Sequence, residues 1–121
     1  MYPFIKIRVW HASGQLVEEI YRVTASFPRD ERFRLTDQIR DAAASVQTNI
    51  AEGSKSESQA DFARFLNYSE KSLTEVQSLL KLSKRLGFII PKDFERIYRL
   101  TLGIARMLHA LKVKVQAQVP A

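Results

Sequence analysis

The chain has 121 residues, no cysteine, four glycines and four prolines, and 45% of its residues are apolar while 26% are charged. This composition is typical of one compact domain with a real hydrophobic core. It excludes disulfide scaffolds and cysteine-ligated zinc modules. Lys6 and Arg8 interrupt the apolar N-terminal residues, and no stretch approaches the roughly 18 apolar residues of a membrane span. We therefore expect a cytoplasmic protein.

The net charge of +6 is distributed unevenly along the chain. Residues 1–80 hold ten Lys or Arg and eleven Asp or Glu, a net charge of −1. Residues 81–121 hold nine basic and two acidic residues, a net charge of +7. Because net charge bears on binding partners rather than on fold, the excess predicts a basic surface formed by the C-terminal third of the chain.

Apolar residues recur at helical spacing in four segments, with turn-forming residues between them. The predicted helices cover approximately residues 9–26, 33–52, 58–86 and 91–115. Short connections force consecutive helices to be antiparallel neighbours. The fold predicted for residues 1–121 is therefore a single all-α domain, an antiparallel up-down-up-down four-helix bundle.

Individual residues predict where these helices begin and end. The first helix stops before Pro28, because a proline disfavours the helical backbone conformation of the residue that precedes it. The second ends at Gly53, which we expect to adopt the left-handed cap conformation. Ser58 and Asp61 form an S-x-x-D pattern that begins the third helix, and Pro91 is tolerated in the first turn of the fourth.

Two features near the N-terminus depart from the helical pattern. Residues 4–9 alternate apolar and charged side chains as a strand does, but a single strand has no partner in an all-helical chain. We therefore expect an extended lead-in that packs on the bundle or on a neighbouring subunit. Gly14 either weakens the first helix by about 1 kcal/mol relative to alanine or allows another helix to approach closely.

Residues that commonly carry catalysis are scarce in this sequence. His11 and His109 lie in different predicted helices, and neither has a histidine or carboxylate at i+4 to complete a metal pair. The sequence also lacks a phosphate-binding glycine loop and a cysteine nucleophile. We expect no catalytic residue, no metal site and no cofactor, and hence a protein that is not an enzyme.

Four polar side chains fall at spacings of three along the second and third predicted helices: Asn49, Glu52, Ser72 and Glu75. Paired carboxylates can shift each other's pKa and perform acid-base chemistry, so an enzyme using Glu52 and Glu75 is a third, least favoured hypothesis. The alternative is structural: Asn49 and Glu52 cap the helix end or pair with Arg40 or Arg64. We favour the structural interpretation, because no sequence feature places these groups in a cleft.

The fourth predicted helix carries the clearest functional pattern, a set of basic residues that we call the basic strip: Lys92, Arg96, Arg99 and Arg106. At roughly 100° per residue, these side chains fall within about 40° of one line and about 125° from the apolar stripe. Such a strip can contact phosphates and give salt-dependent, sequence-independent affinity for nucleic acid. It is equally compatible with a solvated face or with contact to an acidic surface of another subunit.

Several sequence runs resemble a known family of four-helix bundles, the proteins encoded by intervening sequences inside bacterial large-subunit ribosomal RNA genes. The matching runs are LTDQIRDAA at 35–43, NIAEG at 49–53, FARFL at 62–66 and LGFI at 86–89. The resemblance covers roughly residues 8–112. The sequence departs from the family pattern at Gln47, where proline is frequent, and after Gly53, where the usual aromatic and paired basic residues are missing.

The resemblance implies a cytoplasmic left-handed bundle that assembles as a homopentamer and has no established catalytic activity. A more distant resemblance links the chain to the accessory bundle proteins of diversity-generating retroelements, which are basic pentameric barrels that bind nucleic acid and a reverse transcriptase. Apolar residues that remain outside the four stripes are candidates for the subunit interface: Tyr2, Phe4, Trp10 and Phe88.

We therefore expect a non-enzymatic homo-oligomer, a pentamer, that associates with RNA or a nucleoprotein through the basic strip. Neither a membrane nor a small-molecule substrate is expected as a partner. The alternative is a structural oligomeric scaffold, or a protein-protein interaction module, that binds no nucleic acid.

Overall fold

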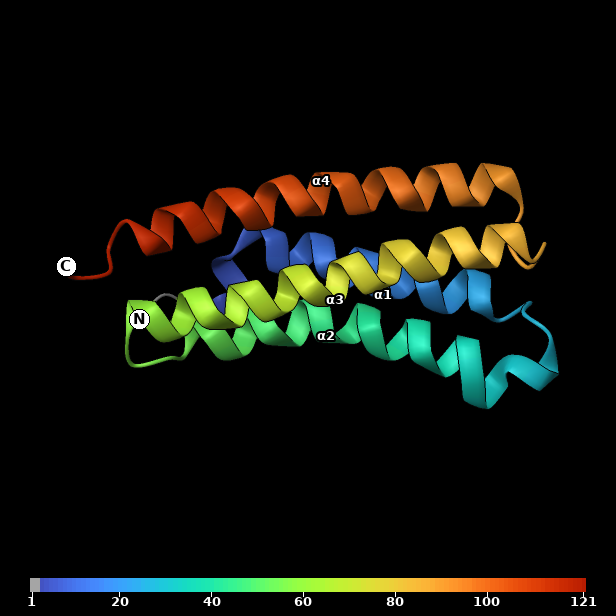
Figure 1. Cartoon of the computed structure of the whole chain (residues 1–121), viewed down its shortest axis with the longest axis horizontal. Helices are drawn as coiled ribbons and strands as arrows, with labels where there is room; N and C mark the ends of the chain where they lie inside the picture. The colour runs from blue at the N-terminus through green and yellow to red at the C-terminus, as the bar shows by residue number, and fades with distance from the viewer. Residues whose placement is uncertain (1–2) are drawn as a thin grey trace.

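The computed structural model describes residues 3–121, in which four long helices lie side by side (Figure 1). They are α1 (Arg8–Thr24), α2 (Asp37–Ser54), α3 (Gln59–Arg85) and α4 (Pro91–Gln116). The colour gradient runs one way along α1 and α3 and the opposite way along α2 and α4. Each helix packs on the next, α4 also packs on α1, and residues 3–121 contain no strand. The predicted all-α four-helix bundle is confirmed.

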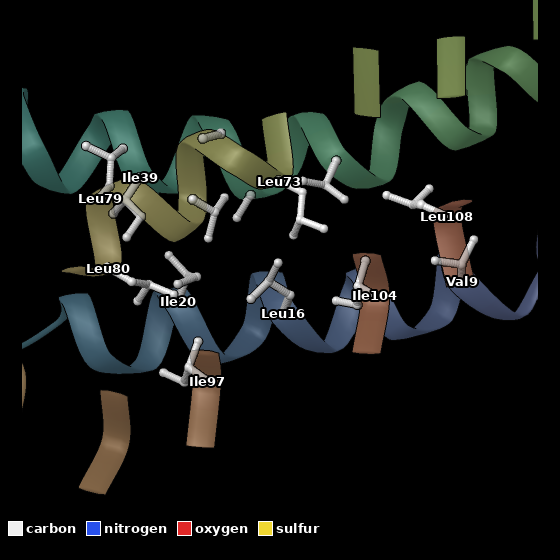
Figure 2. Close-up of a cluster of buried hydrophobic side chains, with 14 of the residues drawn as sticks. Val9, Leu16, Ile20, Ile39, Leu73, Leu79, Leu80, Ile97, Ile104 and Leu108 are labelled. Atoms are coloured by element: carbon white, nitrogen blue, oxygen red, sulfur yellow. The ribbon is translucent and has the colours of Figure 1, made fainter. Parts of the chain in front are cut away.

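The core lies along the axis shared by the four helices. Figure 2 shows Leu16 of α1, Ile39 of α2, Leu80 of α3 and Ile97 and Ile104 of α4 converging on this interior. All five side chains are at most 1% exposed. Complete burial of a side chain of this size contributes about 1.5–3 kcal/mol, so the apolar stripes are the main source of stability.

The most extensive contact between two helices joins α2 and α3, and small and hydroxyl-bearing residues lie in it. Ala42 and Ala43 are buried on α2, and buried Ser69 of α3 donates its hydroxyl to the carbonyl of Val46 at 2.6 Å. A buried hydroxyl without a partner would be costly, so this bond both satisfies Ser69 and fixes the register of the two helices.

Two predicted helix boundaries are confirmed in detail. The hydroxyl of Ser58 accepts from the backbone N–H of Asp61 at 3.1 Å, which is the expected cap of α3. Pro91 occupies the first turn of α4 after Ile90, whose backbone is extended. Between these helices Gly87 has φ +79°, a left-handed conformation that glycine adopts without a steric penalty.

The predicted start of the second helix at residue 33 is wrong, because α2 begins at Asp37. After Pro28 the chain crosses the end of the bundle through two short turns, Arg29–Glu31 and Arg32–Thr36. The backbones of Phe33 and Arg34 are not helical within the second turn. This bend leaves the Phe33 side chain 80% exposed and brings Leu35 into the core.

Gly53 is not the predicted left-handed cap; it lies inside α2, which continues to Ser54. The reason for glycine here is close packing. A Cβ at this position would lie 2.8 Å from the Cβ of Phe65 and 2.9 Å from Cδ1 of Phe62 on α3. The absence of a side chain at Gly53 therefore allows α3 to approach α2 where the loop joins them.

The N-terminal lead-in is a 3₁₀ turn at Phe4–Lys6 rather than an extended segment. It packs on the bundle as expected, since Phe4 contacts the hydrophobic core and Ile7, directly after the turn, is buried. A Cβ at Gly14 would lie 2.8 Å from Nε2 of Gln47, so the atoms nearest to Gly14 belong to the end of a flexible side chain of α2 rather than to its backbone. No helix within residues 3–121 combines the length and the apolar character needed to cross a membrane.

Candidate nucleic-acid interface

The basic strip lies on the outer face of α4. Pro91 and the extended Ile90 begin the helix, and Phe94, Ile97, Ile104 and Leu108 are buried on its inner face. Helical geometry turns the four basic positions away from that apolar stripe. The structure places all of them on the exposed surface: Lys92, Arg96, Arg99 and Arg106.

Arg96 differs from the other members of the basic strip because it is held by two carboxylates. Its guanidinium donates to Glu19 of α1 at 2.9 Å and to Asp93, one turn earlier on α4, at 2.7 Å. The hydrogen bond to Glu19, followed by the one to Asp93, raises the pKa of Arg96 above its ordinary value. These partners offset its charge locally, so Arg96 is the least available of the four for an external anion.

Lys92, Arg99 and Arg106 have no such partner in the described part of the chain. No carboxylate oxygen of residues 3–121 lies within 4.0 Å of their cationic nitrogens. Gly103 leaves space beside the guanidinium of Arg106, whose Nη2 would lie 3.9 Å from a Cβ at that position. The charges that are available to phosphate are therefore those of Lys92, Arg99 and Arg106.

Two lysines on α3 extend the positive surface around the first turns of α4. The ammonium of Lys84 lies 4.5 Å from the centre of the Phe94 ring, and that of Lys81 lies 5.2 Å from the centre of the Tyr98 ring. Cations at these distances are attracted by the face of the ring. The sequence pattern did not place Lys84 in the basic strip, because a cation in the last turn of a helix is already explained by the helix dipole, and Lys81 lies one turn earlier on α3.

Apolar side chains also reach the surface beside the basic strip. Leu102 is 42% exposed and Val113 is 50% exposed. Leu102 lies between Arg99 and Arg106 at spacings of three and four, so these three side chains share one outer line of α4. A mixed basic and apolar face of this kind is also compatible with a subunit or partner contact.

The structure divides the second candidate set, Asn49, Glu52, Ser72 and Glu75. Asn49 donates to the hydroxyl of Ser45 at 3.0 Å, and this hydroxyl lies 2.8 Å from that of Ser72, so two members meet through Ser45. Glu75 accepts from Gln38 at 3.2 Å. Glu52 is exposed near the other end of α2, fourteen residues or roughly 21 Å along the helix from Gln38. The two carboxylates are therefore not a catalytic pair.

The predicted arginine partners of Asn49 and Glu52 are also wrong. Arg40 donates to Thr24 at 2.8 Å, and Arg64 bonds Asp61 and Tyr68 within its own helix. Asn49, Ser72 and Glu75 instead contribute to the contact between α2 and α3, where Ser45 and Ser72 meet.

Neither the histidines nor an apolar groove along α4 contains a catalytic constellation. Nε2 of His11 lies 2.6 Å from the carbonyl oxygen of Ile5, and Nδ1 of His109 lies 4.0 Å from Glu70. Within residues 3–121, no three His, Asp or Glu side chains cluster as metal ligands do. An apolar groove of about 610 Å³ between α4 and the start of α1 and α3 is lined by residues such as Ile7, Phe62 and Leu111, with no acidic or histidine side chain among its lining.

The geometry defines the class: a helical bundle with one basic outer face and no assembled catalytic group in the described residues. A sequence profile of the 23S rRNA-intervening sequence protein family matches residues 6–110. The chain belongs to this family. A comparison with curated proteins finds no match.

A solved structure supports the same assignment. It is the 1.70 Å crystal structure of a protein of unknown function from the S23 ribosomal protein family of Bacteroides thetaiotaomicron VPI-5482. The two proteins are 25% identical and superpose with a TM-score of 0.77 over 86% of this chain and 97% of the other. Neither the family description nor the description of this neighbour names an enzymatic activity.

Proposed function

We propose that this chain is a non-enzymatic, cytoplasmic homo-oligomer that associates with RNA or a nucleoprotein through the basic strip of α4. The observation that carries the proposal is the set of exposed cations without a carboxylate partner within residues 3–121: Lys92, Arg99 and Arg106. Cations of this kind neutralise phosphates and release condensed counterions, which gives affinity without sequence recognition.

Assembly would increase this affinity. In a closed ring every subunit repeats the basic strip, and several weak contacts add through avidity when the strips face a common surface. We propose a pentamer. Of the four interface candidates, Phe4 and Trp10 are half-buried against each other, and Phe88 is half-buried against Phe27. Tyr2 lies outside the described residues.

Exposed apolar residues elsewhere are better interface candidates. Phe33 is 80% exposed, and Ile90 is 61% exposed in the loop before α4. Leu102 and Val113 add apolar surface on α4 itself. The same two residues favour the second candidate function, in which the outer face of α4 contacts another protein and no nucleic acid is bound.

The test is an electrophoretic mobility shift series with an RNA hairpin, run beside sizing of the same samples. The variant replaces Lys92, Arg99 and Arg106 by Gln together. The control replaces Lys55, Lys71 and Arg85 by Gln, which removes the same charge from exposed positions off the strip. Loss of the shift in the first variant alone, with an unchanged oligomer, supports RNA contact.

The protein-scaffold alternative gives a different result in the same experiment. It predicts no shift by wild type at physiological salt and a changed oligomeric state when the strip is neutralised. Failure of wild type to bind any RNA at low salt would exclude the nucleic-acid interpretation.

A further inference from the structure

A second basic feature lies at the end of the bundle, where the chain crosses from α1 to α2 (cyan in Figure 1). A polar pocket of about 260 Å³ opens there. Its lining includes three arginines and two threonines: Arg29, Arg32, Arg40, Thr24 and Thr36. The arginines belong to the part of the chain whose net charge is −1, so the charge distribution along the sequence gives no indication of this site.

Arg40 is held in a fixed position at this pocket. Its guanidinium lies 4.4 Å from the centre of the Tyr21 ring, and its Nε donates to the hydroxyl of Thr24 at 2.8 Å. Thr24 is 3% exposed, and its hydroxyl in turn donates to the carbonyl of Ile20 at 2.7 Å. Because Nε makes the internal bond, the two terminal nitrogens of Arg40 remain to bind an oxyanion as a fork.

The pocket concentrates positive charge without an internal counterion. No carboxylate oxygen of residues 3–121 lies within 4.0 Å of Arg29, Arg32 or Arg40. This holds although Asp30 and Glu31 lie between the first two arginines in the sequence. Three cations around one small polar space repel each other, and a bound anion removes that repulsion.

We propose that this pocket binds a phosphoryl group. Planar guanidinium groups match the oxygens of phosphate, and the hydroxyl-bearing side chain of Thr36 lines the same space. The volume is below the roughly 300–1,000 Å³ of pockets that enclose drug-sized ligands, so the site suits a phosphate and a few attached atoms. Two sources share this chemistry, free phosphate and the terminal phosphate of a nucleic acid.

The pocket lies at the same end of the bundle as the beginning of the basic strip. Phe27, before the crossing, contacts Phe88 of the loop that precedes α4, with ring centres 5.7 Å apart. Figure 1 shows this crossing and the first turns of α4 at one end of the molecule. An RNA that follows the strip toward Lys92 can therefore place its end near the pocket, and this source of phosphate rests on the proposed function.

The test is an NMR titration of the whole chain with inorganic phosphate, and then with an oligoribonucleotide carrying either a 5′-phosphate or a 5′-hydroxyl. Saturable shifts are expected at residues 24–40 with phosphate. Replacing Arg29 and Arg32 together by Gln should weaken phosphate binding about tenfold or more, because each hydrogen bond to a charged group contributes strongly. Both residues are exposed, so the fold should be retained.

Two further variants separate geometry from charge. Arg40→Lys keeps the charge but loses the fork and the bond to Thr24, and it should weaken phosphate binding as the double variant does. Arg34→Gln removes an exposed arginine of the same crossing that does not line the pocket, and binding should stay within about twofold of wild type.

The outcomes distinguish the two sources of phosphate. About a tenfold preference for the 5′-phosphorylated oligonucleotide over its 5′-hydroxyl twin assigns the pocket to a nucleic-acid end, whereas binding of inorganic phosphate without that preference assigns it to a free phosphate. The variant in which Gln replaces Lys92, Arg99 and Arg106 should still bind inorganic phosphate, even if the basic strip of α4 does not bind RNA. Absence of saturable shifts at residues 24–40 with every probe, or an equal loss in Arg34→Gln, would overturn the proposal.

Discussion

Arg96 of α4 donates a hydrogen bond to Glu19 of α1 at 2.9 Å, and this ion pair joins the basic strip to the body of the bundle. Asp93 holds the same guanidinium from the preceding turn. The pair links α1 and α4, which contact each other less extensively than the other neighbouring helices do. Arg96 therefore has a structural role that Arg99 and Arg106 lack.

Replacing Arg96 by Gln should lower the free energy of unfolding by no more than about 1 kcal/mol, because the pair is partly exposed and solvent weakens it. RNA binding should change less than in Arg99→Gln, since the charge of Arg96 is already offset. Denaturant unfolding and RNA titration of the two single variants measure both quantities. A larger loss of RNA binding in Arg96→Gln than in Arg99→Gln would contradict the conclusion that Arg96 is less available to phosphate than Arg99.

Leu73→Ala should cost about 2–5 kcal/mol, because Leu73 is 2% exposed in the middle of α3 and its removal opens a cavity. Chemical unfolding at a fixed protein concentration is the measurement, since association changes apparent stability. A cost below about 0.5 kcal/mol would show that the core tolerates the loss and that Leu73 is not tightly packed.

Two glycine substitutions should change stability in opposite directions. Gly53→Ala places a Cβ less than 3 Å from Phe65 and Phe62, so it should destabilise by about 1–3 kcal/mol. Gly103→Ala meets an ordinary contact at 3.9 Å and should stabilise by about 0.5–1 kcal/mol through helix propensity. Thermal unfolding of both variants is the check; destabilisation by Gly103→Ala would indicate that this face of α4 is covered in the assembly.

The sequence predicts the fold well because helical spacing and turn residues act locally. Ser58 and Pro91 mark helix starts through bonds and backbone angles within a few residues, and the structure agrees. Gly53 shows where local reasoning fails. Its role depends on Phe62 and Phe65 packing from the next helix, and no rule for helix ends includes that contact.

The sequence was sufficient to predict which face of α4 carries the basic residues, but not which of their charges are paired. The spacing of Lys92, Arg99 and Arg106 is sufficient to place them on one exposed face of α4. The partner of Arg96 is Glu19, which is 77 residues away along the chain, so tertiary packing alone determines that pair. The arginine pocket likewise depends on the non-helical backbone of Phe33 and Arg34, where the apolar pattern predicts a helix start.

The oligomeric state is a separate prediction. Native mass spectrometry at micromolar concentration should give a closed pentamer, which is the assembly that the family resemblance implies, and exposed apolar residues such as Phe33 and Ile90 are candidates for its interface. Phe33→Ser and Ile90→Ser should shift the distribution toward smaller species if these residues lie at the interface. A stable wild-type monomer would rule out the proposed assembly.

The most direct test of the central claim is the salt dependence of RNA binding, measured as the slope of log Kobs against log salt concentration. Wild type should show a steep negative slope, and replacing Lys92, Arg99 and Arg106 by Gln should reduce its magnitude by about 2–3, because each lost phosphate contact removes roughly 0.7–0.9. The control variant, in which Gln replaces Lys55, Lys71 and Arg85, should keep the wild-type slope. Equal slopes for wild type and the strip variant would show that the basic strip of α4 does not contact RNA.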